Sequence, residues 1–218
     1  MTTARTDAIR RFTAAETDAM VAAGIVPASE RGSVRASRRF TVAEYLALGE
    51  AGILAKEERI ELLDGEIIQM APIGNRHLMS VDWLSDLLRE LIGRRAMVRV
   101  QGSIQLDDAT MPEPDIAVIR RRSINDVGPT LPSDVYLLVE VADSSLEFDL
   151  GEKLARYAAA GIPEVWVANL RGGELVVNTE PEGAAYANTR VIPLGGRVSP
   201  QVFPDVTLEL ADFIPAVD

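Results

Sequence analysis

Residues 135–169 read VYLLVEVADSSLEFDLGEKLARYAAAGIPEVWVAN, and this run says most about the fold. The segment Val135–Val141 is almost unbrokenly apolar, which is typical of a strand buried on both faces. Residues 149–160 form a predicted helix that ends before Gly161 and Pro163. A second apolar run follows at residues 164–169. Two buried strands joined by a helix favour an α/β fold.

The flanking sequence extends this prediction to a mixed sheet. Two apolar runs flank Asp64-Gly65, which is the strongest short signal for a β-hairpin. Apolar positions recur at helical spacing from Asn75 to Ile92. A polar loop is predicted over residues 120–133. Further strands are predicted at residues 97–106, 115–119, 174–177, 185–194 and 206–210.

Composition excludes several classes of protein. The chain of 218 residues is 47% hydrophobic, which is enough to bury a core. Twenty-two basic and 33 acidic residues give a net charge of −11, which excludes binding to nucleic acid by bulk charge. The absence of Cys and the single His exclude thiol nucleophiles and the usual zinc sites. Neither a membrane span nor a signal peptide is recognisable, so we expect a cytoplasmic protein without membrane contact.

An internal repeat occupies the N-terminal part of the chain. Residues 11–31 read RFTAAETDAMVAAGIVPASER, and residues 39–59 read RFTVAEYLALGEAGILAKEER. Each copy opens with the Thr-x-x-Glu pattern of a capping box and closes its predicted helix with Ala-Gly-Ile. We favour a duplicated helical lead-in, with residues 1–36 as an N-terminal extension of a domain at 37–218. A domain-swapping or dimerising arm is the alternative.

Two acids stand out at the predicted strands. Glu140 is the only charge in its buried run, so it is either paired, bound to a cation, or exposed where the strand ends. Asp115 opens another strand, where an Asp often bonds nearby backbone amides. If the two strands are antiparallel neighbours, Asp115 and Glu140 converge at one end of the sheet. Convergent carboxylates suit Mg²⁺ or Mn²⁺.

Three further residues have both a structural and a functional interpretation. Lys153 lies four residues from Asp149 and from Tyr157 on one line of a helix, which is either an exposed ion pair or an amine directed at the same sheet end. Glu61 lies in a hairpin strand. His77 begins a helix and points inward, where a histidine is more often structural than a ligand.

These residues lie in motifs that resemble a known family. The motifs are RIELLDGEII (59–68), PIGNRH (72–77), PEPD (112–115) and the stretch 137–166. Over residues 39–214 the chain resembles the Uma-two family of endonucleases, which is assigned to the restriction-endonuclease-like, PD-(D/E)XK superfamily. The resemblance implies a restriction-endonuclease-like mixed β-sheet flanked by helices, with an N-terminal helical extension. It also implies a DNA substrate and a homodimer.

The resemblance assigns roles to single residues. Asp115 matches the Asp of the "PD" motif and Glu140 the second acid, so both would bind the metal and take part in catalysis. The superfamily's lysine position is Ala142 here, but the family carries a lysine on the following helix, which Lys153 matches. Glu61 matches an acid that could bind the metal, and His77 and Tyr157 match supporting residues of the family.

The resulting hypothesis is a metal-dependent endonuclease that hydrolyses DNA phosphodiester bonds with Mg²⁺ or Mn²⁺. The run Arg120, Arg121 and Arg122 is the best candidate contact for nucleic acid, although we favour a solvated charged surface as its explanation. The alternative is a catalytically silent binding or assembly module with the nuclease fold, which the replacement at Ala142 and the acidic charge favour. A two-carboxylate hydrolase with another substrate ranks last, because it leaves Lys153 without a role.

Overall fold

The computed structural model describes residues 9–32 and 38–216 of the chain. The chain forms two compact units. The first comprises Met1–Pro72 and Gln105–Pro112, and the second comprises Ile73–Ile104 and Glu113–Asp218. The predicted boundary between residues 36 and 37 lies outside the described residues, so the division into 1–36 and 37–218 stays a prediction.

The first unit combines two short helices with a β-hairpin. The predicted hairpin is confirmed, because Asp64 and Gly65 both have positive φ values, 51° and 76°, as a two-residue type I′ turn requires. Gly65 is also needed for space, since a Cβ there would lie 2.8 Å from Cβ of Arg39. The elements of this unit are α2 (Ala14–Ala22), η1 (Ala28–Glu30), α3 (Val42–Glu50), β1 (Ile60–Leu63) and β2 (Glu66–Gln69).

The second unit is built on a six-stranded mixed sheet in the order β3-β4-β5-β6-β7-β8. Its strands are β3 (Ala96–Val100), β4 (Ile116–Arg120), β5 (Val135–Ala142), β6 (Glu164–Asn169), β7 (Glu174–Glu182) and β8 (Ala185–Pro193). β5 and β6 are parallel, and the other neighbours are antiparallel. A separate pair is formed by β9 (Arg197–Val198) and β10 (Leu208–Glu209). The α/β fold with a mixed sheet is therefore confirmed.

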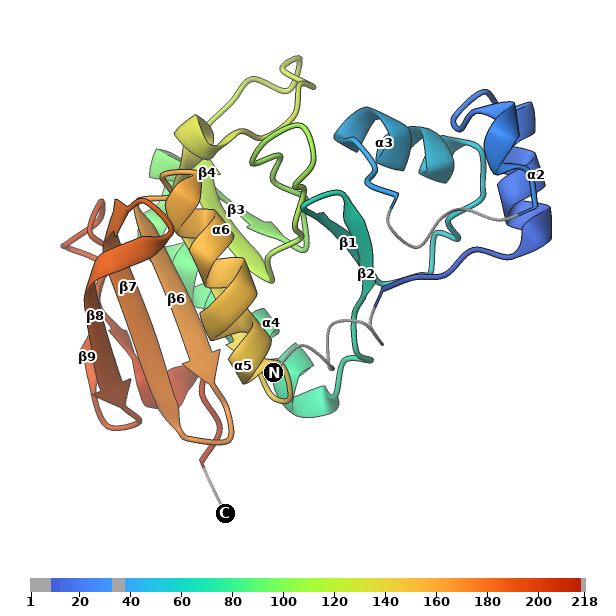
Figure 1. The fold of residues 1–218 in the computed structure, drawn as a ribbon. Coiled ribbons are helices and arrows are strands. Elements are labelled where there is room, and N and C mark those ends of the chain that lie inside the picture. Colours follow the sequence, from blue (N-terminus) through green and yellow to red (C-terminus); the bar gives the residue numbers. More distant parts are fainter. Residues whose placement is uncertain (1–8, 33–37, 217–218) are drawn as a thin grey trace. The chain divides into compact units, whose positions relative to one another are not determined.

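Helices cover both faces of this sheet (Figure 1). The helix α4 (Asn75–Ile92) has the predicted bounds and buries Val81, Leu84 and Leu88 in one core with alternate residues of β5. Because side chains alternate along a strand, the residues between them face the opposite side. That side carries one helical segment, which consists of α5 (Leu146–Phe148), the π-helical turn η4 (Asp149–Lys153) and α6 (Leu154–Ala159).

Short 3₁₀ turns complete the second unit: η2 (Gly93–Arg95), η3 (Pro132–Asp134) and η5 (Leu210–Asp212). Among the helices of the described ranges, none is both long enough and apolar enough to cross a membrane.

Some predicted strands are wrong in length. The predicted strand at residues 97–106 ends at Val100, because Gln101 adopts a left-handed conformation with φ of 48° and the chain then passes into the first unit. The predicted strand at 206–210 is only β10, whereas β7 extends well beyond the predicted 174–177. Each error arises where packing, rather than local pattern, sets the end of the strand.

Candidate active site

Asp115 and Glu140 occupy facing positions on neighbouring strands of the second unit. The last residue pair between β4 and β5 at this end is Ile116 with Val139, so Asp115 lies opposite Glu140, one position further along. Asp115 is the residue directly before β4, and Glu140 lies within β5. Both acids are buried, with 7% and 3% of their surface exposed. The predicted antiparallel pairing therefore brings the two carboxylates to one end of the sheet.

The carboxylate of Asp115 is fixed by two contacts. Its Oδ2 atom accepts a hydrogen bond of 2.7 Å from the backbone N–H of Val141, and its Oδ1 atom lies 2.9 Å from Nε2 of His77. Because an ionised carboxylate can only accept hydrogen bonds, Nε2 is the donor in the second contact. The inward position predicted for His77 at the start of α4 thus places its ring on Asp115. The bond to Val141 ties Asp115 to the residue after Glu140.

Glu140 is held from the opposite side by the π turn and α6. Its Oε1 atom accepts a hydrogen bond of 2.5 Å from the hydroxyl of Tyr157 and lies 2.9 Å from Nζ of Lys153. Lys153 is 2% exposed and Tyr157 is fully buried. The alternative of an exposed Asp–Lys pair on this helix is therefore wrong. Removing one partner from such a buried ion pair typically costs about 3–5 kcal/mol, because an uncompensated charge remains.

Lys153 and position 142 both belong to the surroundings of the Glu140 face of β5. Ala142 is two residues beyond Glu140 on β5, so both side chains face the same side of the sheet. A lysine at position 142 would extend from that face, and Lys153 reaches the face from the helix that covers it. The π turn that ends at Lys153 is a rare geometry that occurs frequently at functional sites.

Sequence reasoning did not find two features of the site. One is the backbone N–H of Val141, which fixes Asp115 but leaves no mark in the sequence. The other is the burial of Asp149, whose Oδ2 atom accepts a hydrogen bond of 2.5 Å from the hydroxyl of Ser145. The spacing of four residues placed Asp149 in line with Lys153, but only as the partner in an exposed ion pair.

The remaining predicted site residues belong to other elements of the chain. Glu61 is a buried residue of β1 in the first unit. Arg120 donates a hydrogen bond of 2.5 Å to the carbonyl oxygen of Ser133, and Arg122 donates to carbonyl oxygens of the same loop. Arg121 is exposed. Two of the three arginines thus hold their own loop, whereas the structural interpretation of the run expected only a solvated surface.

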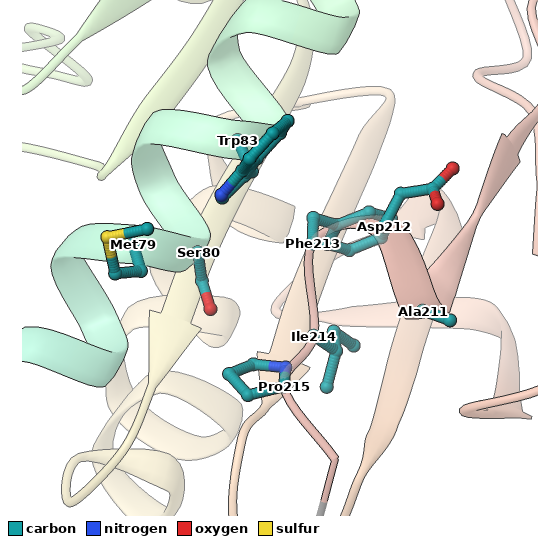
Figure 2. A pocket seen from close by; sticks show the side chains of 8 residues that line it. All are labelled: Met79, Ser80, Trp83, Ala211, Asp212, Phe213, Ile214 and Pro215. Atoms are coloured by element: carbon teal, nitrogen blue, oxygen red, sulfur yellow. The ribbon is translucent and has the colours of Figure 1, made fainter.

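A pocket of about 260 Å³ lies between α4 and the C-terminal segment of the second unit (Figure 2). Its walls come from Met79, Ser80 and Trp83 on α4 and from residues 211–215. None of the predicted site residues lines it. The pocket therefore plays no part in the chemistry proposed below.

The chemistry of the site suits a divalent cation. Asp115, Glu140 and the backbone carbonyl of Val141 offer hard oxygen atoms, which Mg²⁺ and Mn²⁺ prefer. Across residues 9–32 and 38–216, no group of three or more His, Asp or Glu side chains is arranged to hold a metal. Mg²⁺ is often bound by only one or two carboxylates together with water and substrate phosphates. Two acids therefore fit such an ion.

A mixed sheet with helices on both faces, and two acids on adjacent strands, defines a protein of the restriction-endonuclease-like class. The sequence of residues 42–211 matches the model of the Uma2 family, described as "Putative restriction endonuclease", and the chain belongs to that family. The match begins inside the second copy of the N-terminal repeat.

A solved nuclease structure shares this fold. It is the crystal structure of a "putative nuclease belonging to DUF820" from Anabaena variabilis ATCC 29413. It matches with a TM-score of 0.66 and 17% sequence identity, over 80% of this chain and 97% of that chain. A comparison with curated proteins finds no match.

Proposed function

We propose that the protein is a metal-dependent endonuclease that hydrolyses DNA phosphodiester bonds. The observation that carries the proposal is the pair Asp115, directly before β4, and Glu140 on β5, with the ammonium group of Lys153 at 2.9 Å from Glu140. Two acids and an amine at one sheet end can support phosphodiester hydrolysis, since they can hold a cation and stabilise the charge that develops on the phosphate as water attacks. Membership of the Uma2 family supports the same activity.

Asp115, Glu140 and the carbonyl oxygen of Val141 would hold the Mg²⁺ or Mn²⁺ ion. When bound, such an ion neutralises phosphate charge and lowers the pKa of a coordinated water. The assignment of Glu61 as a further ligand, which came from the family resemblance, stays a prediction. Its own variant, Glu61→Gln, tests that assignment through Mn²⁺ affinity.

The other side chains act by holding charge in place. Lys153 is the candidate catalytic residue, because its ammonium group can orient a water molecule or stabilise charge on the phosphate. Tyr157 is a positioning residue that fixes the Glu140 carboxylate through its hydroxyl. His77 positions Asp115 in the same way. Burial keeps these groups away from bulk water, which strengthens their electrostatic interactions.

Binding of DNA needs local positive charge, because the whole chain is acidic. Arg120 and Arg121 are both exposed, but Arg120 donates to the carbonyl oxygen of Ser133, so Arg121 is the candidate phosphate contact. The homodimer and the cytoplasmic location expected from the sequence stay predictions.

A catalytically silent binding or assembly module is the second candidate. The observation that favours it is Ala142, which occupies the superfamily's lysine position. In this case the buried pair of Glu140 and Lys153 would be a structural remnant.

Cleavage and metal binding together separate the two candidates. Wild-type protein, Asp115→Asn and Glu140→Gln are incubated with supercoiled and linear DNA with and without Mn²⁺ or Mg²⁺, and Mn²⁺ binding is measured by calorimetry. We expect metal-dependent cleavage that each substitution lowers by at least roughly 10²–10³-fold, the usual cost of removing one charge-stabilising group. Asp86→Asn is the matched control, because that acid on α4 is 80% exposed.

Each result favours one candidate. Equal cleavage by all variants would remove Asp115 and Glu140 from the mechanism. A wild-type protein that neither binds the metal nor cuts DNA would support the silent module.

A further inference from the structure

The two copies of the N-terminal repeat have the same local structure. α2 and α3 both have nine residues and both begin at a capping box, formed by Thr13 with Glu16 and by Thr41 with Glu44. Each helix ends in a left-handed glycine at the equivalent position of its copy. The repeat in the sequence is therefore a repeat in the fold.

The copies also contribute equivalent side chains to a shared core. Met20 and Leu48 are equivalent, and both are fully buried in the same cluster. The rings of Phe12 and Phe40, which are also equivalent, lie 5.7 Å apart and contact each other. Two identical positions meet only when the two copies are related by an approximate two-fold rotation, as in an isologous interface.

The ion pairs follow the same rule. Each copy is preceded by an arginine that pairs with the capping-box glutamate of its own copy, Arg10 with Glu16 at 2.7 Å and Arg38 with Glu44 at 2.5 Å. Each arginine also reaches the other copy. The cross-copy pairs join Arg10 to Glu58 at 2.6 Å and Arg38 to Glu30 at 2.8 Å.

These cross-copy pairs are reciprocal, because Glu58 and Glu30 are equivalent positions of the repeat. An interface between two identical chains produces such reciprocity automatically, since residue i contacts j and j contacts i. A single chain has no symmetry that would require it. The first unit thus contains the contact pattern of a homodimer inside one chain.

We propose that the paired face of the second copy (residues 38–59) is a self-association surface, which accepts the first copy (residues 10–31) of its own chain or of a second copy of this protein. The family match begins at residue 42 and so includes only the second copy. The first copy therefore supplies from within the chain what a partner chain would supply. This inference is independent of the nuclease proposal.

Within one chain the linked copy has the advantage. A segment attached by a short linker has an effective concentration in the millimolar range, so the intramolecular pair prevails at micromolar protein. Substitutions that weaken the contact between the two copies within one chain, but preserve the same contact between two chains, should therefore reveal binding of the first copy of one chain to the second copy of another.

Charge reversal of one cross-copy pair achieves this in the full-length protein. In the Arg10→Glu chain, the new acid faces Glu58 of the other copy and also lies near Glu16 of its own copy, and in the Glu58→Arg chain two cations face each other. In a mixed pair, Glu at position 10 of one chain meets Arg at position 58 of the other, and the second contact is equally favourable. Native mass spectrometry, with one chain ¹⁵N-labelled, distinguishes mixed pairs from like pairs. We expect mixed pairs to exceed like pairs by about tenfold or more.

Two controls make the result decisive. The double variant Arg10→Glu/Glu58→Arg restores the opposite charges within one chain, so it should show no enrichment of mixed pairs with the wild-type chain. The variants Arg38→Glu and Glu30→Arg test the equivalent contact. They replace the first pair of variants if circular dichroism shows that the first pair has lost helical structure. If dimers of the two different variants are no more abundant than dimers of one variant, and the variants are folded, the proposal is overturned.

Discussion

Two clusters of ion pairs, one in each unit, use the same chemistry under different conditions. In the first unit, Arg10 is 11% exposed and its partners Glu16 and Glu58 are about one quarter exposed. In the second unit, Lys153 and Glu140 are 2% and 4% exposed. A half-buried pair can contribute to stability without a large desolvation penalty, whereas a fully buried one is often no better than apolar residues of the same size.

The difference teaches where to look for chemistry. Stability alone does not explain why Glu140 and Lys153 are charged, because a well-packed apolar pair would serve as well. The ion pairs of Arg10 join the two repeat copies, and this structural role explains why the residues of that cluster are charged. The buried cluster is therefore the one whose charges indicate a function.

The largest expected effect comes from breaking the buried pair. Lys153→Met leaves Glu140 without its ammonium partner and should lower the free energy of unfolding by about 3–5 kcal/mol. Both tryptophans of the chain, Trp83 and Trp166, belong to the second unit. Urea unfolding followed by tryptophan fluorescence therefore reports on this unit.

The double variant Glu140→Leu/Lys153→Met is the control for this change. It should regain most of the lost stability, because no buried charge remains, while cleavage stays abolished. A loss in the single variant below about 1 kcal/mol, the range of exposed pairs, would contradict the burial on which the comparison depends.

A smaller effect is expected when the half-buried cluster is broken. Arg10→Met removes pairs with Glu16 and Glu58 and should cost about 1–2 kcal/mol, between the values for exposed pairs and for charged hydrogen bonds. Arg38→Met should cost the same amount, because its contacts are equivalent. Hydrogen exchange of the amides in α2 and α3 measures the local stability. Protection lost in only one helix would mean that the two copies do not support each other.

The capping boxes give a finer test of the symmetry. Thr13→Ala and Thr41→Ala each remove the hydroxyl that accepts a hydrogen bond from the backbone of the glutamate three residues later. Each change should cost about 1 kcal/mol. Urea unfolding followed by circular dichroism should give equal losses for the two variants, with Thr→Ser at the same positions as the conservative control.

The smallest effect is a dependence of stability on pH. The hydrogen bond from Arg10 lowers the pKa of Glu58 below its ordinary value of 4.5. Burial raises the pKa of Glu16, but hydrogen bonds from Arg10 and Thr13 outweigh burial, so this pKa is also lowered. Both acids bind more protons in the unfolded chain, so their contribution is complete above pH 4.5 and is lost as the pH falls through their folded pKa values.

Arg10→Met should remove much of that dependence. Stability curves of the wild type and the variant, measured by circular dichroism, should converge as the pH falls below 4.5. Parallel curves over this range would contradict the assigned cause of the shifts.

Local features of this fold could be predicted because they depend on neighbouring residues. Asp64-Gly65 requires a tight turn wherever it lies between two apolar runs, and the periodicity of residues 75–92 specifies a helix with one buried face. The strand that ends at Val100 could not be bounded in this way. Its end is set by Gln101 and by packing of the following segment in the other unit.

The site was predictable in part for the same reason. Two acids on strands that are near in sequence converge once the strands pair, and β4 and β5 do pair as antiparallel neighbours. The amide of Val141 that fixes Asp115, and the ion pair between Arg10 and Glu58, depend on backbone placement over long separations. No periodicity in the sequence encodes such contacts. The functional roles of the site residues stay predictions.

The π turn at Asp149–Lys153 has a consequence for variation in this region. A π turn holds one more residue than an α-helical turn. Because each residue of an α-helix advances about 100° around the axis, the extra residue changes the direction in which all later side chains of the segment point. Removal of a single residue there, such as Gly151, would rewind the segment and rotate either the lysine or the leading turn away from the sheet. We therefore expect one-residue deletions in this helical segment to cost far more stability than substitutions at its exposed positions.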